Sequence, residues 1–183
     1  MDDYIDWEIE QRRVGAFYLG MTKEELVRKL EEMGVEYRFV CNGTMLKIDS
    51  ITFWFGQLGD DMLDKNNLTA MYLYDNFRGK FQGKIGIGTI PYEVVGIEYY
   101  GEVEPGMSNT FYLPRYPGIT FSLNVKSFVD DKTPIEEIHV TNWKSEIEWA
   151  ALYRKDKWMQ ENSIKLMAEY RKLGEEYRRG RNE

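Results

Sequence analysis

One stretch near the N-terminal end of the chain carries a clear helical pattern. Four apolar residues recur there at spacings that place them on one face of a helix: Leu26, Val27, Leu30 and Met33. Thr22 precedes them as a candidate N-cap, and acidic residues follow it in the first turn. Gly34 stands where the helix would end. The pattern therefore predicts a short helix between Thr22 and Gly34.

Alternation of apolar and polar residues predicts strands after this helix. The first group covers about 36–41, about 44–55 with a turn near Asp49-Ser50, and about 68–74. A second group covers about 111–113, 119–125 and 135–141, with a turn at Tyr116-Pro117-Gly118. A weaker helical segment precedes the second group, because Pro91 fits only a first turn and β-branched residues follow it. Each group indicates a short helix followed by an antiparallel meander.

These two groups repeat each other at a spacing near 67 residues. Ile51-Thr52-Phe53 recurs as Ile119-Thr120-Phe121, 68 positions later. At 67 positions, Leu68, Met71 and Leu73 align with Ile135, Ile138 and Val140; at 66, Leu19-Gly20-Met21-Thr22 aligns with Ile85-Gly86-Ile87-Gly88. Aligned segments that occur in the same order in both halves of a chain are typical of an internal duplication.

We therefore predict an α+β fold of two tandem α-βββ repeats, at about 17–76 and 83–142, in one domain over 1–142. The repeats would share one antiparallel sheet, with both helices on one face and the other face open. Residues 143–183 would add a long C-terminal helix. Its apolar stripe includes Met159, Leu166, Met167, Tyr170, Leu173 and Tyr177.

The opening Leu-Gly-Met-Thr-x-Glu-Glu-Leu of residues 19–26, the meander after it and the second copy resemble the tandem-repeat architecture of beta-lactamase inhibitory protein. A single unit is also similar to the small lipoprotein domains of outer-membrane assembly. The likeness covers about residues 17–142. The chain differs from both families in its acidic N-terminal segment and predicted C-terminal helix, and we expect neither a signal peptide nor a lipobox cysteine. What the resemblance implies is a protein that binds another protein.

Strand parity separates the aromatic residues into two sets. In Ile51-Thr52-Phe53-Trp54-Phe55 the phenylalanines fall on the face under the helices, and Trp54 falls on the other. The same rule places these aromatic residues on the open face: Trp54, Tyr72, Tyr74 and Tyr112. Because Trp and Tyr dominate the energetic centres of protein interfaces, we predict that this face binds a partner.

Two alternatives remain for the C-terminal helix. It docks on the domain's own surface, which includes the open sheet face, or it forms a homodimer interface. If it covers the open face, the binding site moves to two acidic loops, which precede the last strand of each repeat. Their predicted partner-binding residues are Asp60, Asp61, Asp64, Asp130 and Asp131. Such loops would favour a basic partner by electrostatic steering.

The composition of the chain argues against several kinds of functional site. The chain has 183 residues, 27 of them aromatic, and a formal net charge of −7. One cysteine and one histidine predict neither an internal disulfide nor a Cys/His metal site, and His139 is expected in mid-strand rather than in a catalytic set. We predict no cofactor, no direct nucleic-acid binding and no membrane span. The acidic N-terminal residues do not resemble a signal peptide, so we expect a cytosolic protein.

These observations favour a binding protein over an enzyme. The leading hypothesis is a cytosolic immunity protein that neutralises a toxin, such as a basic nuclease domain, by stoichiometric occlusion. The first alternative is an adaptor or structural protein that self-associates through its C-terminal helix. The second is a small-molecule binder or hydrolase with a pocket between helices and sheet, using Asp60 or Asp130.

Overall fold

The computed structural model describes residues 3–56, 66–90, 100–102, 110–113, 115–123 and 133–142, with the backbone alone described at 100–102 and 111–112. The described part of the chain is α+β with antiparallel sheets, as predicted. The predicted C-terminal helix at 143–183, the weaker helix after Pro91 and both acidic loops lie outside the described residues.

The predicted helix is α1 (Lys23–Met33), and its two ends are fixed by local hydrogen bonds. Glu25 N donates to Thr22 Oγ1, and Thr22 N donates to the Glu25 carboxylate, which together form a capping box. Gly34 ends the helix in the left-handed conformation at φ 67°, which glycine adopts without a steric penalty. The helix buries Leu26 and Leu30 in the core.

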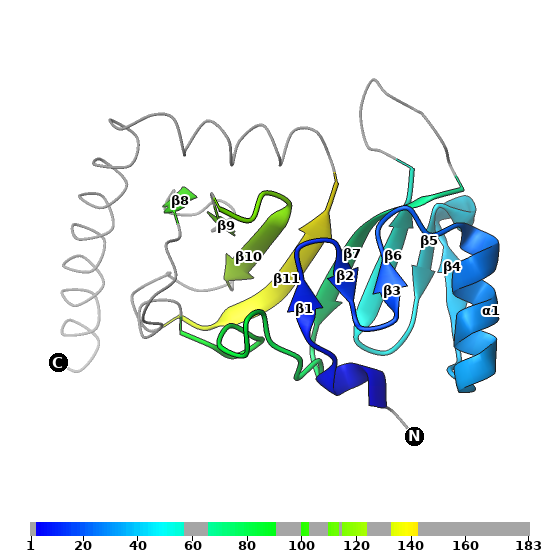
Figure 1. Ribbon diagram of the computed structural model, residues 1–183, viewed down its shortest axis with the longest axis horizontal. Coiled ribbons are helices and arrows are strands. Elements are labelled where there is room, and N and C mark those ends of the chain that lie inside the picture. Colours follow the sequence, from blue (N-terminus) through cyan, green and yellow to red (C-terminus); the bar gives the residue numbers. More distant parts are fainter. Residues whose placement is uncertain are drawn as a thin grey trace, which may run out of the picture.

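Eight strands form the large sheet, in the order β4-β5-β6-β7-β11-β10-β9-β8. Figure 1 shows α1 beside β4 at one edge and β8 at the other. The strands of the first half are β4 (Arg38–Val40), β5 (Met45–Lys47), β6 (Ile51–Phe55) and β7 (Leu68–Tyr74). Those of the second half are β8 (Tyr100–Glu102), β9 (Thr110–Tyr112), β10 (Ile119–Leu123) and β11 (Ile135–Thr141). All neighbours pair antiparallel.

This order is symmetric about the central β7–β11 pair, and the details of the two halves recur at the spacing seen in the sequence. The register between β6 and β7 skips Thr69, which marks a bulge in β7, and the register between β10 and β11 skips Glu136, 67 positions later, which marks a bulge in β11. In the β7–β11 register Tyr72 pairs with His139, its own counterpart at 67 positions. The pseudo-two-fold axis of the sheet therefore passes between these two residues.

Backbone hydrogen bonds correct one part of the predicted repeat. Gly20 N donates to Leu68 O, and Gly88 N donates to Ile135 O. Gly20 thus corresponds to Gly88, 68 positions away, and both adopt positive φ. The offset of 66 that aligned Gly20 with Gly86 was wrong. The similarity there depends on short glycine-containing segments, which can be aligned at more than one offset.

A second, smaller sheet was not predicted. It consists of β1 (Ile9–Glu10), β2 (Arg13–Val14) and β3 (Phe17–Tyr18), in that order. The Phe17 ring meets the Phe53 ring of β6 edge-on, with the ring centroids 4.9 Å apart. The small sheet therefore packs on the same face of the large sheet as the core, in front of it in Figure 1. Two short 3-10 helices, at Asp3–Asp6 and Cys41–Gly43, complete the described elements.

Candidate functional site

The two faces of the large sheet differ in their residues as parity predicts, but the face predicted to be open is not open throughout, since Thr52, Thr120 and Thr141 on it are at most 3% exposed. We call the face that packs against α1 and the small sheet the inner face, and the opposite one the outer face. Inner-face residues are at most 3% exposed and belong to one apolar cluster: Ile51, Phe53, Phe55, Met71, Leu73, Ile119, Phe121, Leu123, Ile135, Ile138 and Val140. On the outer face Trp54, Tyr72, Tyr74 and His139 are all half-buried.

An aromatic row crosses three strands of the outer face. The ring centroids of Trp54 on β6 and Tyr72 on β7 lie 5.7 Å apart, with the planes tilted by 47°. The Tyr72 ring stacks on His139 of β11, at 3.9 Å and 14°. Pairs of this geometry are worth about 0.5–1.5 kcal/mol beyond the area they bury. The row holds these side chains in fixed orientations, which reduces the entropy that a partner must remove on binding.

Tyr74 continues the outer face toward the end of β7. Thr52 Oγ1 donates to Tyr74 Oη at 3.1 Å, and Lys47 Nζ lies 5.4 Å from the centroid of the Tyr74 ring. An ammonium at that distance from an aromatic face is attracted by the ring quadrupole. The outer face therefore already holds one cation of its own against an aromatic ring.

Carboxylates border the same aromatic residues. Glu137 Oε2 lies 3.2 Å from His139 Nε2, with the two side chains 48% and 14% exposed. The hydrogen bond to His139, with smaller contributions from the charges of His139 and Lys47, holds the pKa of Glu137 below its usual value against the opposing effect of burial. The β11 bulge at Glu136 puts Glu136 and Glu137 on the same face, where regular alternation would have separated them.

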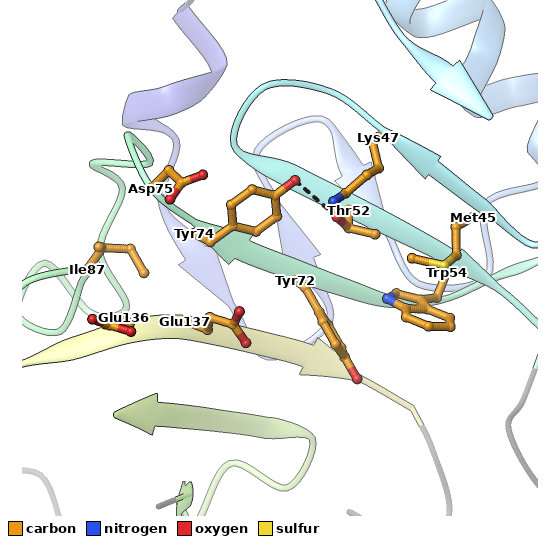
Figure 2. A pocket seen from close by; sticks show the side chains of 10 residues that line it. All are labelled: Met45, Lys47, Thr52, Trp54, Tyr72, Tyr74, Asp75, Ile87, Glu136 and Glu137. Carbon is orange, nitrogen blue, oxygen red and sulfur yellow. Dashed lines mark hydrogen bonds between the residues drawn. The ribbon is translucent and has the colours of Figure 1, made fainter. Parts of the chain in front are cut away.

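These groups surround a shallow hollow of about 570 Å³, which we call the outer-face hollow. Its described lining consists of Met45, Lys47, Thr52, Trp54, Tyr72, Tyr74, Asp75, Ile87, Glu136 and Glu137. Figure 2 shows Trp54 at one end of the hollow and Asp75 toward the other, with Glu137 on β11 beside Tyr72 and Tyr74 of β7. Asp75 follows β7 at a positive φ of 51°, a backbone conformation that Asp tolerates better than most residues.

Of the predicted site residues, the structure brings Trp54, Tyr72 and Tyr74 together around the hollow. Tyr112 is described only in its backbone, which pairs with Thr120 of β10. The five loop aspartates lie outside the described residues: Asp60, Asp61, Asp64, Asp130 and Asp131.

Sequence reasoning missed three acidic residues of the hollow. Asp75 gave no signal because it is a turn residue, and such residues are common on any surface. Glu137 does fall on the outer face by parity, but Glu136 would be assigned inward without the bulge. An aligned repeat could have suggested the bulge, since Thr69 occupies the equivalent position in β7.

Inward and outward positions of the two halves follow different rules. Inward pairs keep their apolar character: Ile51 with Ile119, Phe53 with Phe121, Met71 with Ile138, and Leu73 with Val140. Outward pairs vary more: Thr52 with Thr120 is identical, but Trp54 with Ser122, Ala70 with Glu137, and Tyr74 with Thr141 differ. The core explains the inward agreement, because both halves pack against the same apolar layer. It does not explain why Trp54 and Tyr74 stand outward in the first half where Ser122 and Thr141 stand in the second.

Among the described residues, no group of three or more Asp, Glu, His or Cys side chains is placed to hold a metal ion. In the described ranges, no helix combines the length and apolar character needed to cross a membrane. Comparison of the chain with protein-family models, curated proteins and solved structures gives no match.

Proposed function

We propose that this chain is a cytosolic protein-binding inhibitor that captures a basic partner on the outer face of its large sheet. The observation that carries the proposal is the outer-face hollow, where Trp54, Tyr72 and Tyr74 stand beside carboxylates. Trp and Tyr supply most of the energy in protein interfaces, and carboxylates select a positively charged partner. A chain with a formal net charge of −7 would also attract such a partner from a distance.

The scaffold in this proposal is a tandem α-βββ duplication, as in beta-lactamase inhibitory protein, whose architecture the sequence resembles. The recurrent bulges and the mirrored strand order support it. A duplicated sheet provides a wide, rigid outer face, because each half is anchored by its own inward residues. The outward residues can then be substituted to fit one partner without disturbing the core.

Inhibition would be stoichiometric occlusion. The partner's surface would lie across the ends of β5, β6, β7 and β11, with apolar groups against Trp54 and cationic groups against Glu137 and Asp75. We propose a toxin domain as the partner and neutralisation inside the producing cell as the role. The acidic charge of the chain supports a basic domain such as a nuclease.

The test begins with capture of a partner from the source cell by the immobilised full-length chain. The captured protein is then produced separately, and its activity is titrated with the full-length chain. The proposal predicts loss of activity with an endpoint at one equivalent, and weaker inhibition by Trp54→Ala and Tyr74→Ala. Glu32→Gln on the exposed side of α1 is the matched control and should inhibit normally.

A captured partner whose activity is unchanged at several equivalents would refute the inhibitor function. Equal inhibition by the wild type and the Trp54→Ala variant would refute the outer face as the site. The immobilised chain could instead capture only further copies of itself. If its mass in solution then falls to that of a monomer when residues 144–183 are deleted, the self-associating adaptor is favoured.

A further inference from the structure

The outer-face hollow has a chemistry more specific than a general acidic surface. Its described lining holds three carboxylates and one ammonium, so its formal charge is −2. Aromatic rings stand beside these carboxylates rather than apart from them: Glu137 pairs with Tyr74 across the strands, and Figure 2 shows it beside Tyr72 as well. A ligand that fits must therefore be cationic and must also present a flat or apolar surface to the rings.

The spread of the carboxylates argues against a small inorganic cation. A metal ion needs several oxygen ligands within about 2.0–2.6 Å of one point. In the described part of the chain, the hollow's acidic side chains are not clustered closely enough to hold such an ion. An organic cation several ångströms long can reach carboxylates that stand apart, and a hollow of about 570 Å³ has room for a side chain of that size.

The rings favour a guanidinium over an ammonium. Arginine is planar and weakly hydrated, so it stacks on aromatic faces and pairs with a carboxylate through two parallel hydrogen bonds. The Trp54 ring, which lines the hollow at one end of the aromatic row, provides such a surface. The Glu137 side chain is 48% exposed, and its contact with His139 uses one of the roughly four acceptor sites of a carboxylate. Lys47 over the Tyr74 ring shows that the face holds a cation in this manner.

We propose that the outer-face hollow receives an arginine side chain of the partner protein, with the guanidinium against the aromatic row and hydrogen-bonded to Glu137. This inference rests on the proposed function, since it identifies the group by which the partner is held. Lys47 is the resident competitor, because its positive charge lies beside the neighbouring Tyr74 ring and acts on the same carboxylate.

The test uses N-acetyl-arginine methylamide as the probe and the neutral citrulline analogue as its isosteric control. The full-length chain is labelled with ¹⁵N, and the indole signal of Trp54 is assigned by its loss in Trp54→Phe. The arginine probe should shift this signal in a saturable way, and the citrulline probe should bind roughly tenfold more weakly because it lacks the charge. Salt should weaken the arginine response.

Three variants sharpen the result. Glu137→Gln should weaken arginine binding roughly threefold to fivefold, and Lys47→Met should strengthen it by a similar factor, because each changes one charge at a partly exposed site. Glu32→Gln, which removes a carboxylate far from the hollow, should leave binding unchanged. Thermal melts of each variant show whether it is folded. Lys47→Met keeps the inference testable even if Glu137→Gln fails to fold, because unfolding cannot produce a gain of binding.

Equal responses to arginine and citrulline, or an equal shift from calcium chloride, would overturn the inference. So would unchanged arginine binding in both Glu137→Gln and Lys47→Met. These failures leave the proposed function intact as long as Trp54→Ala still weakens inhibition of the partner. Loss of that effect refutes the outer face itself, whatever the probe shows.

Discussion

Phe53 and Trp54 are adjacent in β6 but face opposite sides of the sheet, and this allows a matched test of the face assignment. Phe53 is fully buried and meets the Phe17 ring at 4.9 Å. Replacing it with alanine removes a core ring and leaves a cavity, which costs about 3–5 kcal/mol. Trp54 borders the solvent-accessible hollow, so water can fill the space that its removal leaves.

The cost of Trp54→Ala follows from what the side chain contacts. It loses the ring contact with Tyr72, worth about 0.5–1.5 kcal/mol, and part of its burial, so we expect about 1–2 kcal/mol in total. For a chain of 183 residues each kcal/mol shifts Tm by about 2–4 °C. Phe53→Ala should therefore lower Tm by roughly 6–20 °C, and Trp54→Ala by roughly 2–8 °C.

Urea titrations followed by circular dichroism check these values without relying on tryptophan fluorescence. The midpoints should fall in the stated order, while the dependence on urea stays the same for both variants if the unfolding remains two-state. If Trp54→Ala lost as much stability as Phe53→Ala, Trp54 would belong to a packed core. The outer face could not then be a binding surface, and the reasoning that led to the hollow would fail.

Three further predictions concern local structure. Thr22→Ala removes the side-chain acceptor at the start of α1 and should cost about 1 kcal/mol in urea titrations, whereas Thr22→Ser should recover most of it. Gly118→Ala should cost roughly 2–5 kcal/mol, because Gly118 has a φ of 91° and a Cβ there would collide with the Thr141 carbonyl; unchanged stability would contradict this turn geometry. Glu137→Gln should destabilise the protein at pH 7, because the pKa of Glu137 is lowered in the folded state. That contribution is present above its usual value of 4.5 and is lost as the pH falls through the lower folded value, so the variant and the wild type should converge in acid; a constant difference across pH would contradict the hydrogen bond between Glu137 and His139.

Local signals explain why the helix and the longer strands could be predicted. Thr22 and Gly34 fix the ends of α1 by hydrogen bonds within the segment itself. The alternation in β6, β7, β10 and β11 is long enough to show which residues face inward, because one face is fully buried. The placement of His139 in the middle of a strand was confirmed for the same reason.

Other features could not be predicted because they depend on contacts distant in sequence. The strands of the small sheet are two residues long and carry no periodicity, and Phe17 is fixed there by its contact with Phe53. The bulge at Glu136 changes the face of one side chain, which no regular alternation can show. The predicted site therefore contained the aromatic residues of the hollow but not its carboxylates.

The outer face as the binding surface is most directly tested by hydroxyl-radical footprinting of the chain, free and bound to its captured partner. Oxidation of Trp54 and Tyr74 should slow on binding, since both line the hollow. Tyr18 and Phe39, which are 38% and 45% exposed and lie away from it, serve as internal controls and should react at unchanged rates. Protection of Tyr18 or Phe39 with unchanged oxidation of Trp54 and Tyr74 would place the partner elsewhere and contradict the account.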